Sequence, residues 1–164
     1  PAAVSDPFGP LGAAAVALTL GVTGPEKPYD VSPLGLITLD QTTCTGCEVC
    51  ATGCPTAALQ VRRSTGLFEI GFSAASCTAC GTCLTRCPEI GSRAITLDRR
   101  VDPAAIEAGF RILVRHEMRL CTRCGKEIAT DAALRRIEET LGDHAALKSI
   151  TGLCLGCRGT RMVF

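Results

Sequence analysis

The chain has 164 residues and a formal net charge of +1, which argues against bulk electrostatic binding to nucleic acid. Only 4% of the residues are aromatic and Trp is absent, so a core built on large rings is not expected. The 12 cysteines, grouped as C-x-x-C, instead indicate a small protein stabilised by metal thiolates and assembled in a reducing compartment.

Residues 1–35 are rich in Pro, Gly and Ala and are predicted to form an extended N-terminal arm. Within this arm, residues 11–22 (LGAAAVALTLGV) are apolar but shorter than the ~20 residues that span a bilayer. We interpret them as a segment packed on this chain or on a partner, with membrane attachment as the alternative. No starting Met and no secretory signal are visible, so we expect part of a longer cytoplasmic polypeptide, with the inner face of a membrane as the alternative location.

The next elements are predicted strands that surround two cysteine motifs. Residues 36–40 (LITLD) lead into the first motif, and residues 94–98 (AITLD) follow the second. Between the motifs, residues 59–72 form a predicted β-hairpin around a Ser-Thr-Gly turn. The motifs recur at an offset of 33 residues, so that Cys44, Cys47, Cys50 and Cys54 are repeated as Cys77, Cys80, Cys83 and Cys87. This internal repeat predicts pseudo-twofold symmetry.

The C-terminal third is predicted to hold a helix, a strand and a second helix. A capping carboxylate at Asp102 and a proline after it open a short helix that ends near residue 109. Residues 110–120 alternate apolar and charged side chains as a strand does, although their arginines also fit one helix face. Residues 130–142 have helical composition, and Gly142 is the predicted stop.

Both cysteine motifs have the form C-x-x-C-x-x-C-x-x-x-C-P. Two-residue gaps let three thiolates of one loop converge on a cluster, while the fourth cysteine points toward the other loop. Over about residues 36–100, the chain resembles the bacterial two-[4Fe-4S] ferredoxin family. The resemblance implies that Cys44, Cys47, Cys50 and Cys87 hold one cluster, and that Cys77, Cys80, Cys83 and Cys54 hold the second. Structural zinc is the alternative, but eight cysteines in this order have no natural split into tetrahedral pairs.

The last four cysteines form two separate C-x-x-C pairs, Cys121 with Cys124 and Cys154 with Cys157. Two such pairs make a tetrahedral four-sulfur site, which suits zinc or a single iron. The charged insert between the pairs and the missing aromatic cluster distinguish the site from rubredoxin iron, so we predict zinc, with one iron as the alternative. His116 and His144 are expected to have ordinary surface or packing roles, because four thiolates already close the site.

A second resemblance concerns RLCTRCGKEI and the terminal CLGCR. These stretches are similar to iron–sulfur proteins found with molybdenum oxidoreductases of the formate-dehydrogenase type. The similarity implies an electron-transfer subunit in a larger complex with redox protein partners.

Together these features predict an α+β protein. Residues 36–100 would form a ferredoxin-like domain with two [4Fe-4S] clusters, and residues 101–164 a zinc-ribbon-like module with a helical insert. The predicted function is a one-electron relay that is not catalytic by itself, because the sequence shows no nucleophile–base pair or phosphate loop. The alternatives are the relay portion of a longer catalytic or membrane-attached polypeptide, and a cluster-containing ribbon that binds nucleic acid or a protein through the five basic side chains of residues 111–126.

Overall fold

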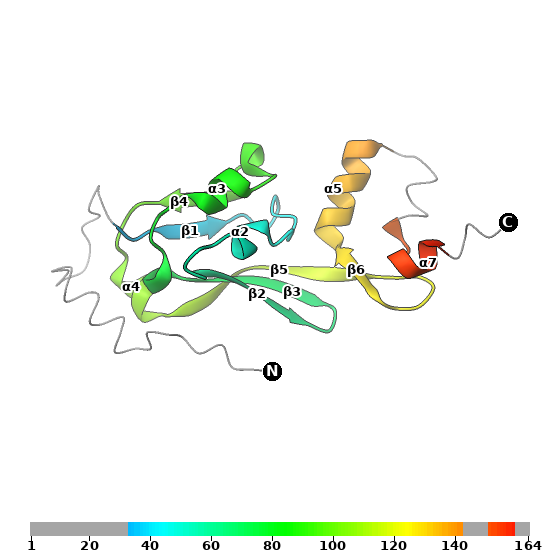
Figure 1. Ribbon diagram of the computed structural model, residues 1–164, viewed down its shortest axis with the longest axis horizontal. Helices are drawn as coiled ribbons and strands as arrows, with labels where there is room; N and C mark the ends of the chain where they lie inside the picture. Colours follow the sequence, from blue (N-terminus) through cyan, green and yellow to red (C-terminus); the bar gives the residue numbers. More distant parts are fainter. Residues whose placement is uncertain (1–32, 143–150, 160–164) are drawn as a thin grey trace.

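The computed structural model describes residues 33–142 and 151–159. It is a mixed α and β architecture with two antiparallel sheets, in which a small sheet and two short helices lie over a longer sheet (Figure 1). Most of the predicted N-terminal arm, the apolar residues 11–22 and His144 lie outside the described residues. Within the described part of the chain, no helix has the length and apolar character needed to cross a membrane.

The smaller sheet joins the two copies of the internal repeat. The predicted strands before the first motif and after the second are confirmed as β1 (Leu36–Leu39) and β4 (Ile95–Asp98). The structure shows in addition that they pair antiparallel with each other. The motifs between them carry the short elements α2 (Val49–Thr52), η1 (Ala74–Ser76), α3 (Thr82–Arg86) and η2 (Ile90–Ser92). The element η2 contains the extra residues that follow the second motif in the sequence.

The longer sheet has the strand order β2-β3-β5-β6. Its strands are β2 (Leu59–Ser64), β3 (Leu67–Ser73), β5 (Phe110–Leu120) and β6 (Glu127–Thr130). The predicted hairpin is confirmed, since Ser64 faces Leu67 and Gly66 takes a φ of 77° in the turn. Residues 110–120 form the predicted strand rather than the alternative helix.

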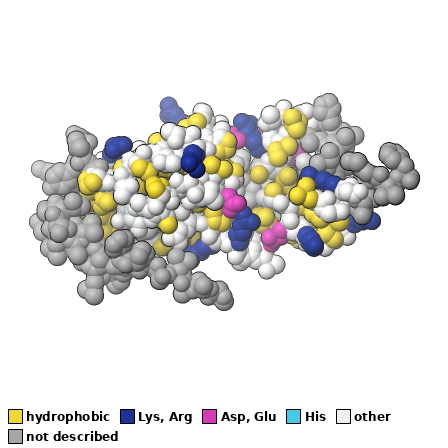
Figure 2. Space-filling view, viewed as in Figure 1, with side chains coloured by type: hydrophobic (Ala, Val, Ile, Leu, Met, Phe, Trp, Pro, Cys, Tyr) yellow, Lys and Arg dark blue, Asp and Glu magenta, His cyan; other side chains and the backbone are white. Residues whose placement is uncertain are grey.

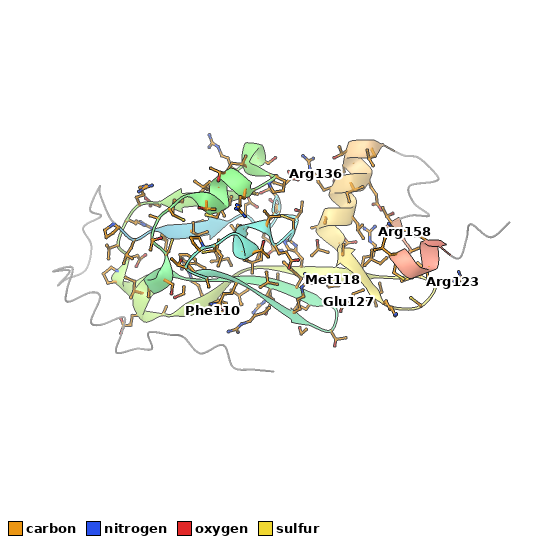
Figure 3. The ribbon with its side chains drawn as sticks, viewed as in Figure 1. Phe110, Met118, Arg123, Glu127, Arg136 and Arg158 are labelled. Atoms are coloured by element: carbon orange, nitrogen blue, oxygen red, sulfur yellow. The ribbon has the colours of Figure 1, made fainter. Side chains whose placement is uncertain are left out.

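Strand β5 pairs with β3 along most of its length, so this sheet continues across residue 100, where the sequence predicts a domain boundary. That boundary stays a prediction. Figure 3 shows Phe110 at the start of β5 and Met118 near the point where β6 joins it.

The remaining described helices are α4 (Pro103–Glu107), α5 (Asp131–Leu141) and α7 (Leu155–Gly159). The predicted cap of α4 is confirmed, because the Asp102 carboxylate accepts a hydrogen bond from the Ala105 N–H at 3.0 Å. Helix α5 starts after Thr130 and ends at Gly142, which has a φ of 76°. The predicted helix stop is therefore confirmed as well.

The core lies between the two sheets. Its fully buried side chains are Ile37, Phe68, Ile70, Phe72, Ile95 and Val114. Each contributes about 1.5–3 kcal/mol relative to an exposed position. Cys44, Cys50, Cys77 and Cys83 belong to the same buried cluster, so the cysteine loops are packed directly against the apolar interior.

Candidate metal centres

The first group of cysteines lines one cavity beside β1 and β4. Its members are Cys44, Cys47, Cys50 and Cys87, with Leu39, Ile70 and Ile95 on the apolar side. Burial, together with the charge of the neighbouring sulfurs, raises the pKa of the Cys50 thiol to about 12. Several thiolates can therefore coexist in this cavity only when a cation compensates their charge.

The second group lines a separate cavity on the other side of the repeat. Its members are Cys54, Cys77, Cys80 and Cys83, with Ile37, Leu59 and Phe72. Burial again raises a thiol pKa, that of Cys83, to about 11. In each cavity, three cysteines of one motif meet the fourth cysteine of the other. The sulfur of Cys83 also raises the pKa of Cys50, so the two groups lie close together.

The backbone of the two loops repeats in the same way as the cysteines. Gly46 and Ala79, which correspond at the offset of 33, have φ values of 68° and 51°, and Glu48 and Gly81 have values of 60° and 77°. Burial raises the pKa values of Cys44 and Cys77, and hydrogen bonds from the Gly46 and Ala79 N–H groups to these sulfurs oppose that rise.

Backbone N–H groups that point at sulfur are the interactions that stabilise iron–sulfur clusters. The cavities, the crossed cysteines and the N–H donors fit two clusters better than tetrahedral zinc sites.

Residues 43–91 match the family described as the 4Fe-4S dicluster domain. The match spans both cysteine motifs and the hairpin between them, and it ends before β4. It supports an iron–sulfur, ferredoxin-like electron-transfer unit in this part of the chain. No curated protein matches the chain. Which cysteine binds which cluster stays a prediction, and the grouping of the two cavities supports it.

The last four cysteines come together at the end of the longer sheet. The sulfur atoms of Cys121, Cys124, Cys154 and Cys157 all lie within 4.8 Å of one another. Backbone N–H groups, that of Cys154 foremost, donate to the Cys121 sulfur and lower its pKa to about 6. Four converging sulfurs, with N–H donors that favour the ionised form of Cys121, are a donor set that can hold one metal ion.

The loop of the first pair is a tight turn that is attached to the second pair. The Gly125 N–H donates to the Cys121 carbonyl oxygen at 2.8 Å, and Gly125 has a φ of 71°. The Thr122 N–H donates to the Gly152 carbonyl oxygen at 3.0 Å. Backbone hydrogen bonds therefore hold the two pairs at the spacing that the four-sulfur group requires.

Three contacts near the first cysteine loop were not apparent from the sequence. His116 has only 6% of its surface exposed and lines a polar cleft of about 480 Å³ between α5 and residues 41–45. The side chain of Gln41 accepts from the Arg115 N–H at 2.9 Å and donates to the Arg115 carbonyl oxygen. Thr130 donates to the Thr45 carbonyl oxygen, although the sequence marks it only as the start of a helix. No short motif joins residues so far apart.

Proposed function

We propose that this chain is a one-electron relay within a larger oxidoreductase complex. The observation that carries the proposal is the pair of neighbouring cavities, each lined by four cysteines taken crosswise from the two motifs. When bound, each [4Fe-4S] cluster supplies reversible one-electron chemistry. Ligand sets that cross between the motifs bring two such centres close together, as a relay requires.

The protein's own residues would shield both centres while leaving each one accessible at the surface. Ile37, Ile70 and Phe72 are almost fully buried and form apolar walls of the two cavities. Cys47 of the first group and Cys80 of the second are exposed. Each centre therefore has one edge at which a redox partner can approach, and an apolar wall that limits the access of water.

We propose zinc for the four-sulfur group of the C-terminal module. Zinc prefers four tetrahedral sulfur ligands in closed structural sites, and it has no accessible redox change. Its role would be to hold the ends of β5 and β6 beside α7. A single iron is the alternative occupant.

Membership of a larger complex is supported by exposed apolar side chains on the C-terminal module. These are Leu120 with 51% of its surface exposed, Ile137 with 42%, Leu141 with 55% and Leu155 with 82%. Exposed large apolar side chains are available for contacts with a protein partner. Together with the sequence similarity to subunits of formate-dehydrogenase-type enzymes, they favour a protein partner, in the cytoplasm or at the inner face of a membrane.

The alternative of a nucleic-acid-binding ribbon is less well supported. Of the basic residues at 111–126, Arg115 pairs with Glu69 at 2.6 Å, and Arg119 pairs with Asp131 and Glu138. On the face of the molecule drawn in Figure 2, Lys and Arg side chains are spread out rather than gathered in one patch. An affinity for DNA or RNA that falls steeply with salt would restore this alternative.

Anaerobic metal and sulfide analysis, combined with EPR of the dithionite-reduced protein, tests the proposal. We expect about eight irons, eight sulfides and one zinc per chain. About nine irons without zinc would place iron in the C-terminal group. Fewer than about four irons with excess zinc, in protein never exposed to oxygen, would contradict the relay.

A further inference from the structure

The side chain of Thr130, at the end of β6, makes contacts in two directions. Its hydroxyl oxygen accepts a hydrogen bond from the Ala133 N–H at 3.2 Å and so caps α5. The same hydroxyl donates to the carbonyl oxygen of Thr45. Only 4% of Thr130 is exposed, so water competes little for these bonds. One buried hydroxyl thus connects the C-terminal module to the loop between Cys44 and Cys47.

The peptide group that joins Thr45 to Gly46 receives this bond. Its carbonyl oxygen accepts from Thr130, and its N–H, on Gly46, donates to the sulfur of Cys44. A hydrogen bond at the carbonyl oxygen of an amide polarises the group and makes its N–H a stronger donor. The hydroxyl of Thr130 therefore acts on the Cys44 sulfur through a single peptide group.

Close packing fixes this peptide group in place. Gly46 has a φ of 68°, and a Cβ atom built on it would lie 2.8 Å from the Thr130 methyl carbon and 2.9 Å from Cδ2 of His116. On the other side of the loop, the Gln41 side chain is held by the backbone of Arg115 in β5. The loop is thus seated directly on β5 and β6.

The internal repeat offers a comparison within the same molecule. Thr78 and Ala79 occupy the equivalent positions of the second motif, and the Ala79 N–H donates to the Cys77 sulfur in the same way. Among the described residues, no side-chain hydroxyl donates to the Thr78 carbonyl oxygen. The two loops therefore share the N–H···S bond but differ in what polarises it.

We propose that Thr130 is a positioning residue that raises the reduction potential of the cluster at Cys44, Cys47, Cys50 and Cys87 relative to the other cluster. N–H···S hydrogen bonds favour the reduced state, which carries one more negative charge, so a stronger donor raises the potential. The inference rests on the proposed relay and concerns how the electron is shared between its two clusters. Through Thr130, the C-terminal module acts on the first of the two repeated sites and favours the electron there, whereas the Cys77 sulfur of the second site has a further N–H donor, that of Gly35.

EPR-monitored redox titration of the full chain tests this inference. Thr130→Val keeps the shape of the side chain but removes the hydroxyl, and it should make one of the two midpoint potentials more negative while leaving the other in place. Thr130→Ser keeps the hydroxyl and should leave both potentials unchanged. Cys47→Ser, which alters only the first ligand set, assigns the shifted signal to its cluster.

A matched variant separates this effect from the stability of α5, because Thr130→Val also removes the helix cap. Leu134→Ala weakens the packing of α5 through a side chain that is 4% exposed, but it keeps the hydroxyl. It should leave both potentials unchanged. The inference is overturned if Thr130→Val moves neither potential, if it moves both equally, or if Leu134→Ala reproduces its effect.

Iron content is measured first for each variant. If Thr130→Val holds fewer than about eight irons, Thr130→Ala removes the hydroxyl without placing a methyl group against the Thr45 carbonyl oxygen. Wild-type protein without two clusters would contradict the relay itself, whereas two clusters with potentials that do not respond to Thr130 would contradict only this inference.

Discussion

Replacing Gly46 by Ala is expected to destabilise the loop that carries Cys44 and Cys47. The residue has a φ of 68°, a left-handed conformation that costs a residue with a Cβ atom about 1–2 kcal/mol. The added Cβ would also lie 2.8 Å from Cγ2 of Thr130 and 2.9 Å from Cδ2 of His116. Overpacking of this kind costs about 1–3 kcal/mol. Together the two effects predict that Gly46→Ala lowers the free energy of unfolding by about 2–5 kcal/mol.

Two further variants separate the backbone effect from the crowding. Ala79 occupies the equivalent position of the second motif with a φ of 51° and is almost fully buried, so the conformation tolerates a Cβ atom where the packing leaves room for one. Ala79→Gly should therefore change the free energy of unfolding by no more than about 1–2 kcal/mol. The double variant Gly46→Ala/Thr130→Ser, which lacks the methyl group of Thr130, should recover part of the stability that Gly46→Ala loses.

Anaerobic thermal unfolding, followed by circular dichroism and by visible absorbance of the clusters, measures these differences. For a chain of this size, each kcal/mol corresponds to about 2–4 °C, so Gly46→Ala should lower the apparent Tm by about 4–20 °C. A Gly46→Ala protein that melts with the wild type would refute the reasoning. A double variant no more stable than Gly46→Ala would show that the methyl group of Thr130 is not the obstacle.

Three other predictions concern the C-terminal half of the chain. Cys154→Ser should lose the metal of the four-sulfur group and keep about eight irons in metal analysis, whereas loss of all iron would contradict separate sites. Arg119→Met should lower the free energy of unfolding by about 1–3 kcal/mol, because it removes the guanidinium group that pairs with Glu138 and leaves Asp131 with its second partner, Arg135; an unchanged Tm would contradict this. Asp102→Ala should lower the free energy of unfolding by about 1 kcal/mol, because it removes the cap of α4. A Tm equal to that of the wild type would mean that the cap contributes nothing.

Much of the local structure could be predicted because it depends on short stretches of sequence. The hairpin of β2 and β3 has runs of strand-forming residues around a glycine that can take a positive φ at Gly66. The helices α4 and α5 begin at a capping side chain, and α5 ends at Gly142. The cysteine spacing indicated that three thiolates of each motif converge, because a gap of two residues leaves little freedom, while the crossing of the fourth cysteine came from the resemblance to two-cluster ferredoxins. The assignment of cysteines to clusters stays a prediction, which the grouping in the two cavities supports.

Long-range contacts could not be predicted in the same way. Thr130 and Thr45 lie 85 positions apart, and a threonine before a helix indicates only a cap. The pairing of β3 with β5 includes a bulge between Ile70 and Gly71, and no local pattern marks it. These contacts depend on how the two sheets close over the cysteine loops, which is a property of the assembled fold.

The position of β3 between β2 and β5 determines which pieces of this chain could stay soluble. Its inner residues Phe68, Ile70 and Phe72 are almost fully buried, and its outer hydrogen-bonding groups are covered only because β5 pairs with them. A fragment cut after residue 100 would expose this apolar strand as an open edge, and such edges recruit strands of other molecules into aggregates. An excised cluster-binding fragment therefore needs the chain through Leu120.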